Sequence, residues 1–190
     1  MKGPLFYSKI LLFGEYGIIK DSKGLSIPYS FYKGALKTDQ DPNHSAIESN
    51  LNLKKFIQYL ATLDASLVTF NSDQLQKDVN EGMYFDSSIP EGYGVGSSGA
   101  LVAAIYDCYA NDKITVLENL TREKLLKLKD IFSNMESFFH GKASGLDPLN
   151  SYLSLPILIH SQNEIETTGI PSQSSNGKGA VFLLDSGTSS

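Results

Sequence analysis

The order of apolar and polar residues predicts strands at the start of the chain and a helix after them. Residues 5–13 have an apolar second half, and residues 26–37 alternate aromatic with polar side chains, so both are predicted as strands. A turn over residues 39–42 follows them. The run from Ser45 to Glu48 matches a capping box, which predicts the N-terminus of a helix there. Apolar residues then recur at helical spacing, at Leu53, Phe56, Ile57 and Leu60.

The middle of the chain predicts a hairpin and two more helices. Residues 75–79 and 83–85 alternate in polarity around residues 80–82, which is typical of two short strands joined by a turn. Residues 100–109 are apolar almost all round, which predicts a buried helix. Thr121 can cap a long helix whose apolar stripe consists of Leu125, Leu128, Ile131, Phe132, Met135 and Phe139.

The last part of the chain is more polar. Residues 161–178 are rich in Ser, Thr, Asn, Gln and Gly, which predicts a loop around a short strand at residues 164–168. Residues 179–185 have the pattern of a buried strand, and the chain then stops without a capping element. Together these elements predict an α+β fold in which a mixed sheet packs on helices.

Composition excludes several classes of partner. The 190 residues are 41% hydrophobic and 19% charged, which is typical of a globular protein with a real core. A net charge of −5 without a run of Lys or Arg argues against nucleic acid or a membrane surface as partner. No apolar run approaches the length of a membrane span, and the first residues lack a secretory pattern. We therefore expect a cytoplasmic protein in which Cys108, the single cysteine, is a core thiol.

Glycines at alternate positions lead into the helix predicted to be buried. Gly92, Gly94 and Gly96 precede Ser97 and Ser98. Such glycines let the backbone approach a ligand closely, and the N–H groups of the following helix N-terminus point at an anion. Because no lysine precedes the serines, this is not a Walker A loop, and no strand ending in an acidic residue follows, as a dinucleotide fingerprint requires. Taken alone, the run is either a phosphate-binding loop or a Gly-rich turn before a core helix.

Three segments resemble, in order, the motifs of the GHMP kinases, the superfamily that includes mevalonate kinase and phosphomevalonate kinase. Residues 90–98 resemble its central ATP-binding motif, Pro-x-Gly-x-Gly-x-Gly-Ser-Ser. Residues 8–19 resemble its first motif, a strand that carries a lysine and ends in Gly-Glu-Tyr. Glu136 and residues 140–147 resemble the mevalonate kinase pattern, in which a helix glutamate precedes a Ser-Gly-x-Asp loop. The resemblance implies a GHMP-kinase-like N-terminal ATP-binding domain over residues 1–178.

The resemblance also bears on the end of the chain. In the family, a strand and turn similar to residues 179–190 lead into a C-terminal domain with a further glycine-rich motif, and nothing in this chain matches that motif. We therefore expect residues 179–190 to lead towards a C-terminal domain that is absent or truncated. Without that domain, little turnover is expected, because it would close over the substrate and exclude water.

The resemblance implies ligands for the nucleotide and its metal. It assigns ATP binding to the glycine loop and its two serines, that is, to Pro90, Gly92, Gly94, Gly96, Ser97 and Ser98. It implies that Ser98 and Glu136 bind Mg²⁺, an ion that commonly takes only one or two protein oxygens besides phosphate. Without the resemblance, Glu136 is equally explained as a salt-bridged or boundary carboxylate, because it lies on or beside the apolar face of its helix.

The resemblance implies two catalytic residues and two substrate-binding residues. Asp147 would accept or orient the proton of the acceptor hydroxyl, and Lys9 would pair with Asp147 and stabilise the alkoxide. Glu15 and Tyr16 would lie near the substrate. Taken alone, Asp147 is favoured as a turn or helix-cap residue, Lys9 as an edge or snorkelling lysine, and Glu15 as a solvated strand-end carboxylate.

Two other residues have simpler interpretations. His140 ends the long helix, where the helix macrodipole favours it, and the three histidines are too scattered to predict a zinc site. Gly99 stands where the family usually has an alanine after the two serines, which is expected to affect only fine packing.

The function that follows from the resemblance is ATP- and Mg²⁺-dependent phosphoryl transfer to the hydroxyl of a small, mevalonate-like metabolite. The Ser-Gly-x-Asp loop favours mevalonate kinase, whereas Tyr16 favours phosphomevalonate kinase. The alternatives are therefore a phosphomevalonate kinase, a sugar-1-kinase, and a nucleotide-binding module without catalysis, because a fold alone does not fix an activity. A homodimer is left open.

Overall fold

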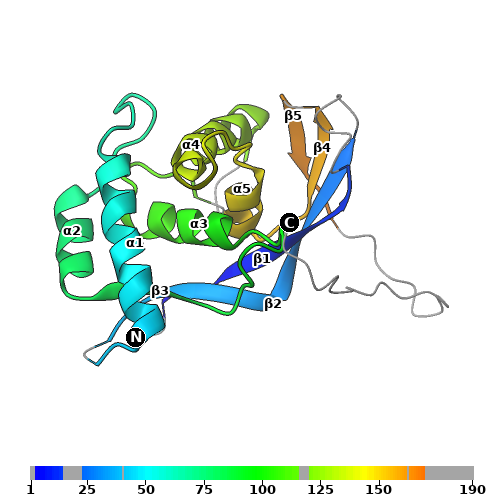
Figure 1. The fold of residues 1–190 in the computed structure, drawn as a ribbon. Coiled ribbons are helices and arrows are strands. Elements are labelled where there is room, and N and C mark those ends of the chain that lie inside the picture. The colour runs from blue at the N-terminus through cyan, green and yellow to red at the C-terminus, as the bar shows by residue number, and fades with distance from the viewer. Residues whose placement is uncertain (1–2, 15–22, 40, 116–119, 162, 170–190) are drawn as a thin grey trace.

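The chain folds into a sheet covered by a group of helices (Figure 1). The computed structural model describes residues 3–14, 23–39, 41–115, 120–161 and 163–169. The described elements, in chain order, are β1 (Phe6–Phe13), β2 (Gly24–Thr38), α1 (His44–Leu60), α2 (Ser72–Asn80), β3 (Met83–Ser87), α3 (Ser97–Tyr109), α4 (Arg122–His140), α5 (Leu146–Leu153), β4 (Ile157–Ser161) and β5 (Glu164–Thr167). The predicted α+β class is confirmed.

The long strand β2 connects the two ends of the sheet. Its residues 34–38 pair with β3, its residues 24–26 pair with β4, and β1 runs along most of its other edge. β5 extends the sheet beyond β4. Every pairing among the described residues is antiparallel, so the expectation of a mixed sheet is wrong for this part of the chain. β1, β3 and β4 all run antiparallel to β2, and none of these three described strands pairs with another, so strands of the same direction are not neighbours.

The predicted strands at residues 5–13, 26–37 and 164–168 are confirmed as β1, β2 and β5. The pairing of β1 with β2 contains a bulge, because Tyr7 lies opposite Lys33 whereas the next residue, Ser8, lies opposite Tyr29. Residues 30–32 of β2 therefore have no partner in β1. The strand predicted for residues 179–185 lies outside the described residues, and β4 was not predicted.

The two helices after β2 differ from expectation at their starts. α1 is confirmed, but its N-cap is Asn43, whose side chain accepts a hydrogen bond from the backbone N–H of Ala46 at 2.9 Å. The capping box predicted from Ser45 is therefore wrong by two residues. A similar cap at Asn71 begins α2, with its side chain accepting from the N–H of Gln74.

α2 replaces the first strand of the predicted hairpin, which is therefore wrong. Leu75 and Val79 are both buried and lie one turn apart on the same face of α2. Residues four positions apart lie on one face of a helix and also on one side of a strand. The alternation of polarity therefore could not distinguish a helix from a strand here. The predicted second strand is present as β3, which pairs with β2 instead of with its sequence neighbour.

The helix predicted to be buried, α3, lies at the centre of the molecule. It contacts α2, α4, α5, β1 and β2, and most of its residues are buried. Figure 1 shows it running beneath α4 and beside α5. Cys108 is exposed, so the expectation of a core thiol is wrong. It lies seven residues after the half-buried Leu101 and therefore on the same face, away from the core.

The remaining helices place the Ser-Gly-x-Asp segment. Thr121 caps α4 as predicted, accepting from the N–H of Lys124. α5 was not predicted, because Gly145 and Pro148 made the segment resemble a turn. Gly145 is the N-cap of α5 with a φ of 74°, and a proline is tolerated in the first turn of a helix. Asp147 therefore lies in the first turn of α5 instead of in a loop.

Gly99 is the point at which α3 and α5 approach each other most tightly. A Cβ atom at this position would lie 2.8 Å from the backbone carbon of Asp147 and 2.8 Å from the backbone nitrogen of Pro148. Because these are backbone atoms, they cannot move aside as a flexible side chain would. The glycine therefore does more than adjust fine packing: it allows the turn that carries Asp147 to lie directly against the first turn of α3.

We predict that Gly99→Ala destabilises the protein, although alanine is the better helix former by about 1 kcal/mol. Overpacking typically costs about 1–3 kcal/mol, and a clash with rigid backbone should outweigh the gain in propensity. Chemical denaturation would measure the change. Gly3→Ala is the matched control, because its Cβ would find only an ordinary contact at 3.6 Å. Equal stability of the two variants would contradict the prediction.

Candidate active site

The glycine loop connects β3 to the N-terminus of α3. Gly92, Gly94 and Gly96 have φ angles of 78°, 66° and 82°, which only glycine adopts at little cost. The backbone N–H of Lys9 donates to the carbonyl of Val95 at 3.0 Å, so the loop is hydrogen-bonded to β1. Gly96 is the N-cap of α3 and has no side chain to cap it. The first N–H groups of α3 are therefore available to an anion, as an anion-binding loop requires.

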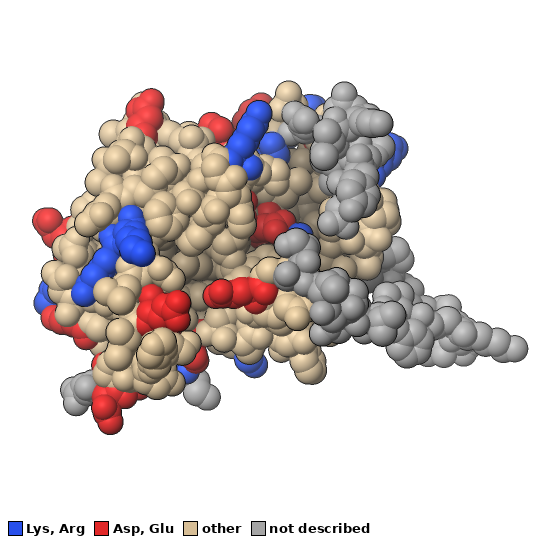
Figure 2. Space-filling view, in the orientation of Figure 1, with Lys and Arg blue, Asp and Glu red and all other residues tan. Residues whose placement is uncertain are grey.

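A cavity of about 890 Å³ opens in front of this loop. It is bounded by the start of α3, by α1 and β3, and by the end of α4, and its size is within the range of ligand pockets. Figure 2 shows this face of the molecule hollowed near its centre, with acidic side chains in and around the hollow. The carboxylates in the lining are Glu48, Asp86, Glu91 and Asp147, and no described lysine or arginine is among the lining residues.

Lys9 and Asp147 form an ion pair at the base of the cavity. The Lys9 Nζ lies 3.0 Å from Asp147 Oδ1, although 138 positions separate the residues, and Lys9 is buried while Asp147 is partly exposed. The expectation that these residues face each other is confirmed. A Cβ at Gly96 would lie 3.1 Å from Lys9 Cγ and 3.6 Å from Asp147 Oδ2, so the pair lies directly against the glycine loop. Asp147 pairs with Lys9 and is not the N-cap of α5, which is Gly145.

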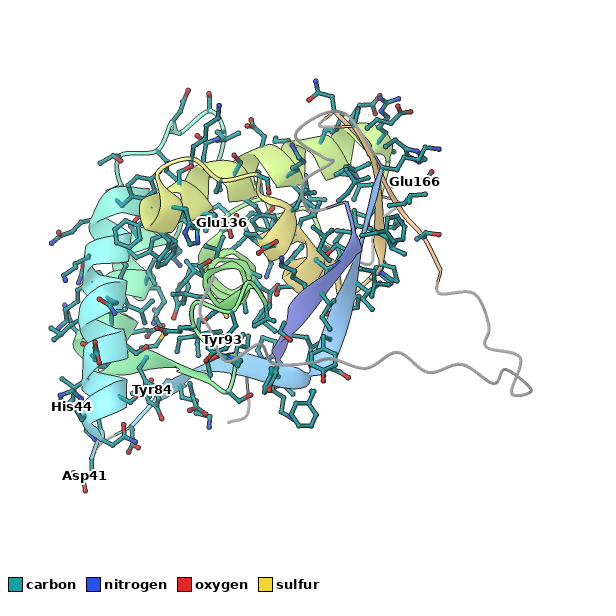
Figure 3. All side chains as sticks on the ribbon, turned by 45° about the vertical axis from the view of Figure 1, so that its right-hand side comes forward. Asp41, His44, Tyr84, Tyr93, Glu136 and Glu166 are labelled. Carbon is teal, nitrogen blue, oxygen red and sulfur yellow. The ribbon has the colours of Figure 1, made fainter. Side chains whose placement is uncertain are left out.

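Glu136 is the most perturbed acid of the site. It lies on the inner side of α4, facing α3, and is only 4% exposed (Figure 3). Burial is the main cause that raises its pKa to about 8, and the nearby negative charge of Asp147 is the second. The Gly145 N–H, the charge of Lys9 and the Ser98 hydroxyl lower the pKa only in part. Glu136 is therefore a carboxyl group that lacks enough positive charge around it to ionise easily.

Ser98 joins the glycine loop to α4. Its Oγ lies 3.0 Å from Nε2 of His140, the last residue of α4, and its hydroxyl also lies near enough to Glu136 to lower the pKa of that carboxyl. The role of His140 was missed from the sequence, which explained it by the macrodipole alone. One signal could have found it, because His140 follows Glu136 by four positions and must share its helix face.

The other predicted site residues divide into two groups. Pro90 and Ser97 line the cavity together with the glycines and Ser98. Glu15 and Tyr16 lie outside the described residues. Sequence reasoning also missed the polar wall that α1 and β3 contribute, which includes Asn43, Ser49, Asn52 and Tyr84, because no motif marks these positions.

The part of the chain that contains this loop and α3 matches a known protein family. Residues 57–154, more than half of the chain, match the family model of the GHMP kinases N terminal domain. The chain belongs to this family. The matched region contains the glycine loop, α3, α4 and α5, so it includes Ser98, Glu136 and Asp147.

A solved mevalonate kinase shares the fold of this chain. Mevalonate kinase from Methanococcus jannaschii is 16% identical in sequence, with a TM-score of 0.50. The match covers 87% of this chain and 55% of the kinase chain. L. major mevalonate kinase, solved in complex with R-mevalonate, is 19% identical with a TM-score of 0.48. This match covers 90% of this chain and 55% of the kinase chain. This GHMP domain chain thus spans about half the length of those kinases. No curated protein sequence matches it.

Two searches of the described residues bear on partners of this GHMP domain. No described helix is both long and apolar enough to cross a membrane. Within the same residues, no three His, Cys, Asp or Glu side chains come together as a metal site. A metal ion held here would therefore take other ligands as well, such as a hydroxyl group or the oxygens of a bound phosphate.

We predict that Glu136→Gln stabilises the protein more strongly as the pH rises. The folded-state pKa of Glu136 is raised from 4.5 to about 8, so its favourable protonated form is present at low pH and is lost as the pH rises through that value. Glutamine imitates the neutral carboxyl at every pH. Thermal unfolding should therefore show little difference between the variant and the wild type near pH 4.5 and a growing advantage of the variant towards about pH 8.

Glu81→Gln is the control for this experiment, because Glu81 is an exposed carboxyl beyond the end of α2. Its stability should follow that of the wild type across the same pH range. A Glu136→Gln variant that also follows the wild type would show that the buried carboxyl ionises without penalty.

Proposed function

We propose that this chain carries the ATP-binding part of a small-molecule kinase that phosphorylates the hydroxyl of a mevalonate-like metabolite. The observation that carries the proposal is the contact of Lys9 and Asp147 with each other and with the glycine loop. In this arrangement Asp147 would be the proton acceptor and Lys9 the cation, both beside the loop proposed to bind phosphate. Phosphoryl transfer to an alcohol needs both of these groups at the site where the phosphate is held.

The glycine loop would hold the phosphates of ATP. The positive φ angles of Gly92, Gly94 and Gly96 bring backbone close to the cavity, and the uncapped N-terminus of α3 adds the favourable end of its dipole. Pro90, Ser97 and Ser98 would complete this ATP-binding segment, since each lines the same cavity.

Ser98 and Glu136 fit the requirements of a Mg²⁺ site. The Ser98 hydroxyl lies near enough to Glu136 to lower the pKa of its carboxyl, both residues present oxygen atoms, and added positive charge would stabilise the ionised form of the buried Glu136. The acidic lining supports the same conclusion, because a polyphosphate would be repelled by four carboxylates unless a cation accompanied it. When bound, Mg²⁺ would neutralise charge that develops on the transferred phosphoryl group.

Asp147 would act as the base for the acceptor alcohol. One of its oxygens pairs with Lys9, and its side chain is partly exposed, so it can receive a proton from a hydroxyl in the cavity. Lys9 is buried and fixed by this pair, so it would stabilise the negative charge that forms on the attacking oxygen. Each residue also neutralises the other, which makes a lysine in an apolar strand tolerable.

The class of acceptor is proposed from the sequence motifs. The Ser-Gly-x-Asp segment favours a mevalonate-like alcohol, and Tyr16 favours a phosphorylated one as the second candidate. Glu15 and Tyr16 are proposed to contact this substrate. Assays with mevalonate, phosphomevalonate and a sugar would rank the acceptors. The assays use a complete kinase that contains this domain, because little turnover is expected without a C-terminal domain. A complete protein that binds ATP but phosphorylates none of the three would instead be a nucleotide-binding module.

We predict that, in a complete kinase containing this domain, Asp147→Asn lowers the turnover number by about 10² or more, because a group that accepts a proton typically contributes that much. Nucleotide affinity should be retained, since asparagine has nearly the size of aspartate and adds no negative charge beside the loop proposed to hold the phosphates. A coupled ADP-release assay and calorimetry with nucleotide would measure the two quantities. Asp107→Asn is the matched control, because Asp107 also pairs with a lysine, Lys113, at 3.2 Å. Unchanged turnover in Asp147→Asn would remove the proposed base.

We predict that Gly96→Val abolishes nucleotide binding. Its φ of 82° is unfavourable for valine, and the added side chain would meet Lys9 Cγ at 3.1 Å, so the loop must change shape. Gly82→Val carries the same backbone penalty at a φ of 92° but lies between α2 and β3, outside the cavity lining. Calorimetric titration should therefore show binding by the control only. Wild-type affinity in Gly96→Val would make the loop purely structural.

A further inference from the structure

His140 and Ser98 come from different elements and meet at the cavity. His140 is the last residue of α4, Ser98 lies in the first turn of α3, and both line the cavity. The Oγ–Nε2 distance of 3.0 Å is that of a direct hydrogen bond. The chain contains three histidines, and His140 is the one that lines the cavity.

The exposed imidazole of His140 contacts an aromatic ring that packs on the core. Its ring centroid lies 6.3 Å from that of Phe139, and Phe139 packs against the buried Phe56 with ring centroids 5.2 Å apart. Gly141 then ends α4 with a φ of 72°. The ring is therefore held at a defined place at the end of the helix, where it can fix a partner.

The hydrogen bond with His140 restricts the Ser98 hydroxyl. A serine hydroxyl without such a partner rotates among three staggered positions, and only some of them would direct its lone pairs towards a ligand. The bond to Nε2 selects the orientation in which the hydroxyl faces the end of α4. Glu136 lies one turn before His140 on the same face of α4, so its carboxyl is near the same hydroxyl.

We propose that His140 is a positioning residue that orients the Ser98 hydroxyl for binding the metal of a metal–nucleotide complex. This inference rests on the proposed function, in which Ser98 supplies an oxygen ligand. His140 acts through Ser98 and touches neither the nucleotide nor the acceptor in this scheme. Partners that orient a metal ligand typically change metal affinity by about 10- to 100-fold, although they do not bind the metal themselves.

The experiment measures the affinity of the full chain for a non-hydrolysable ATP analogue by calorimetry, with Mg²⁺ and with EDTA. His140→Ala should weaken binding about tenfold in Mg²⁺ and leave binding in EDTA unchanged. His140→Gln should restore most of the affinity, because its amide can donate or accept at nearly the position of Nε2. His160→Ala is the matched control, because His160 pairs with Glu166 at the sheet edge, away from the cavity.

A double-mutant cycle distinguishes positioning from a structural role. If His140 acts through Ser98, Ser98→Ala should weaken Mg²⁺-dependent binding and the double variant should be no weaker than Ser98→Ala alone. A merely structural histidine would lower affinity in EDTA as well, and its effect would add to that of Ser98→Ala. Thermal unfolding of each variant shows whether it is folded.

Two failures are distinguishable. If the wild type shows no Mg²⁺-dependent binding of the analogue, the proposed function and this inference are both overturned. If the wild type shows it and Ser98→Ala loses it, but His140→Ala does not change it, only the role of His140 is overturned. Additive effects in the cycle would overturn it as well.

Discussion

The close packing of α3 against its neighbours determines where every candidate site group lies. Gly99 lets α5 approach until backbone meets backbone, which places Asp147 beside the start of α3. The hydrogen bond from Lys9 to Val95 ties the same end of α3 to β1, and Ser98 ties it to α4. Three elements distant in sequence thus converge on one helix N-terminus. Because protein interiors are close-packed, this convergence is rigid and not adjustable residue by residue.

Acidic groups outnumber basic groups among the described residues at this point of convergence. Two carboxylates, Glu136 and Asp147, lie near a single lysine, and Lys9 is paired with Asp147. The pKa of Glu136 is raised because the carboxyl is buried and, second, because Asp147 is negatively charged. A site of this kind costs stability when empty and favours a cation when a ligand brings one, which is a common relation between stability and function.

Much of this site could be predicted because its signals are local. Alternate glycines permit positive φ angles, which Gly92, Gly94 and Gly96 adopt, and a carboxylate beside an apolar helix face indicates burial with a partner, as at Glu136. The parts that failed depend on tertiary contacts. Leu75 and Val79 fit a strand and a helix equally well until β3 is seen to pair with β2. The helix α5 begins with residues typical of a turn, and the contact of His140 with Ser98 requires the angle between α3 and α4.

The bulge between β1 and β2 has a consequence for the neighbours of a single side chain. Side chains of a strand alternate between the two faces of a sheet, so the adjacent residues Ser8 and Lys9 point to opposite faces. Both are buried, at the point where residues 30–32 leave the ladder. Ser8 there lies opposite Tyr29, and Lys9 lies opposite Pro28. Residues 30–32 do not line the cavity, yet the length of their excursion determines which residue of β2 lies beside the cation that reaches Asp147.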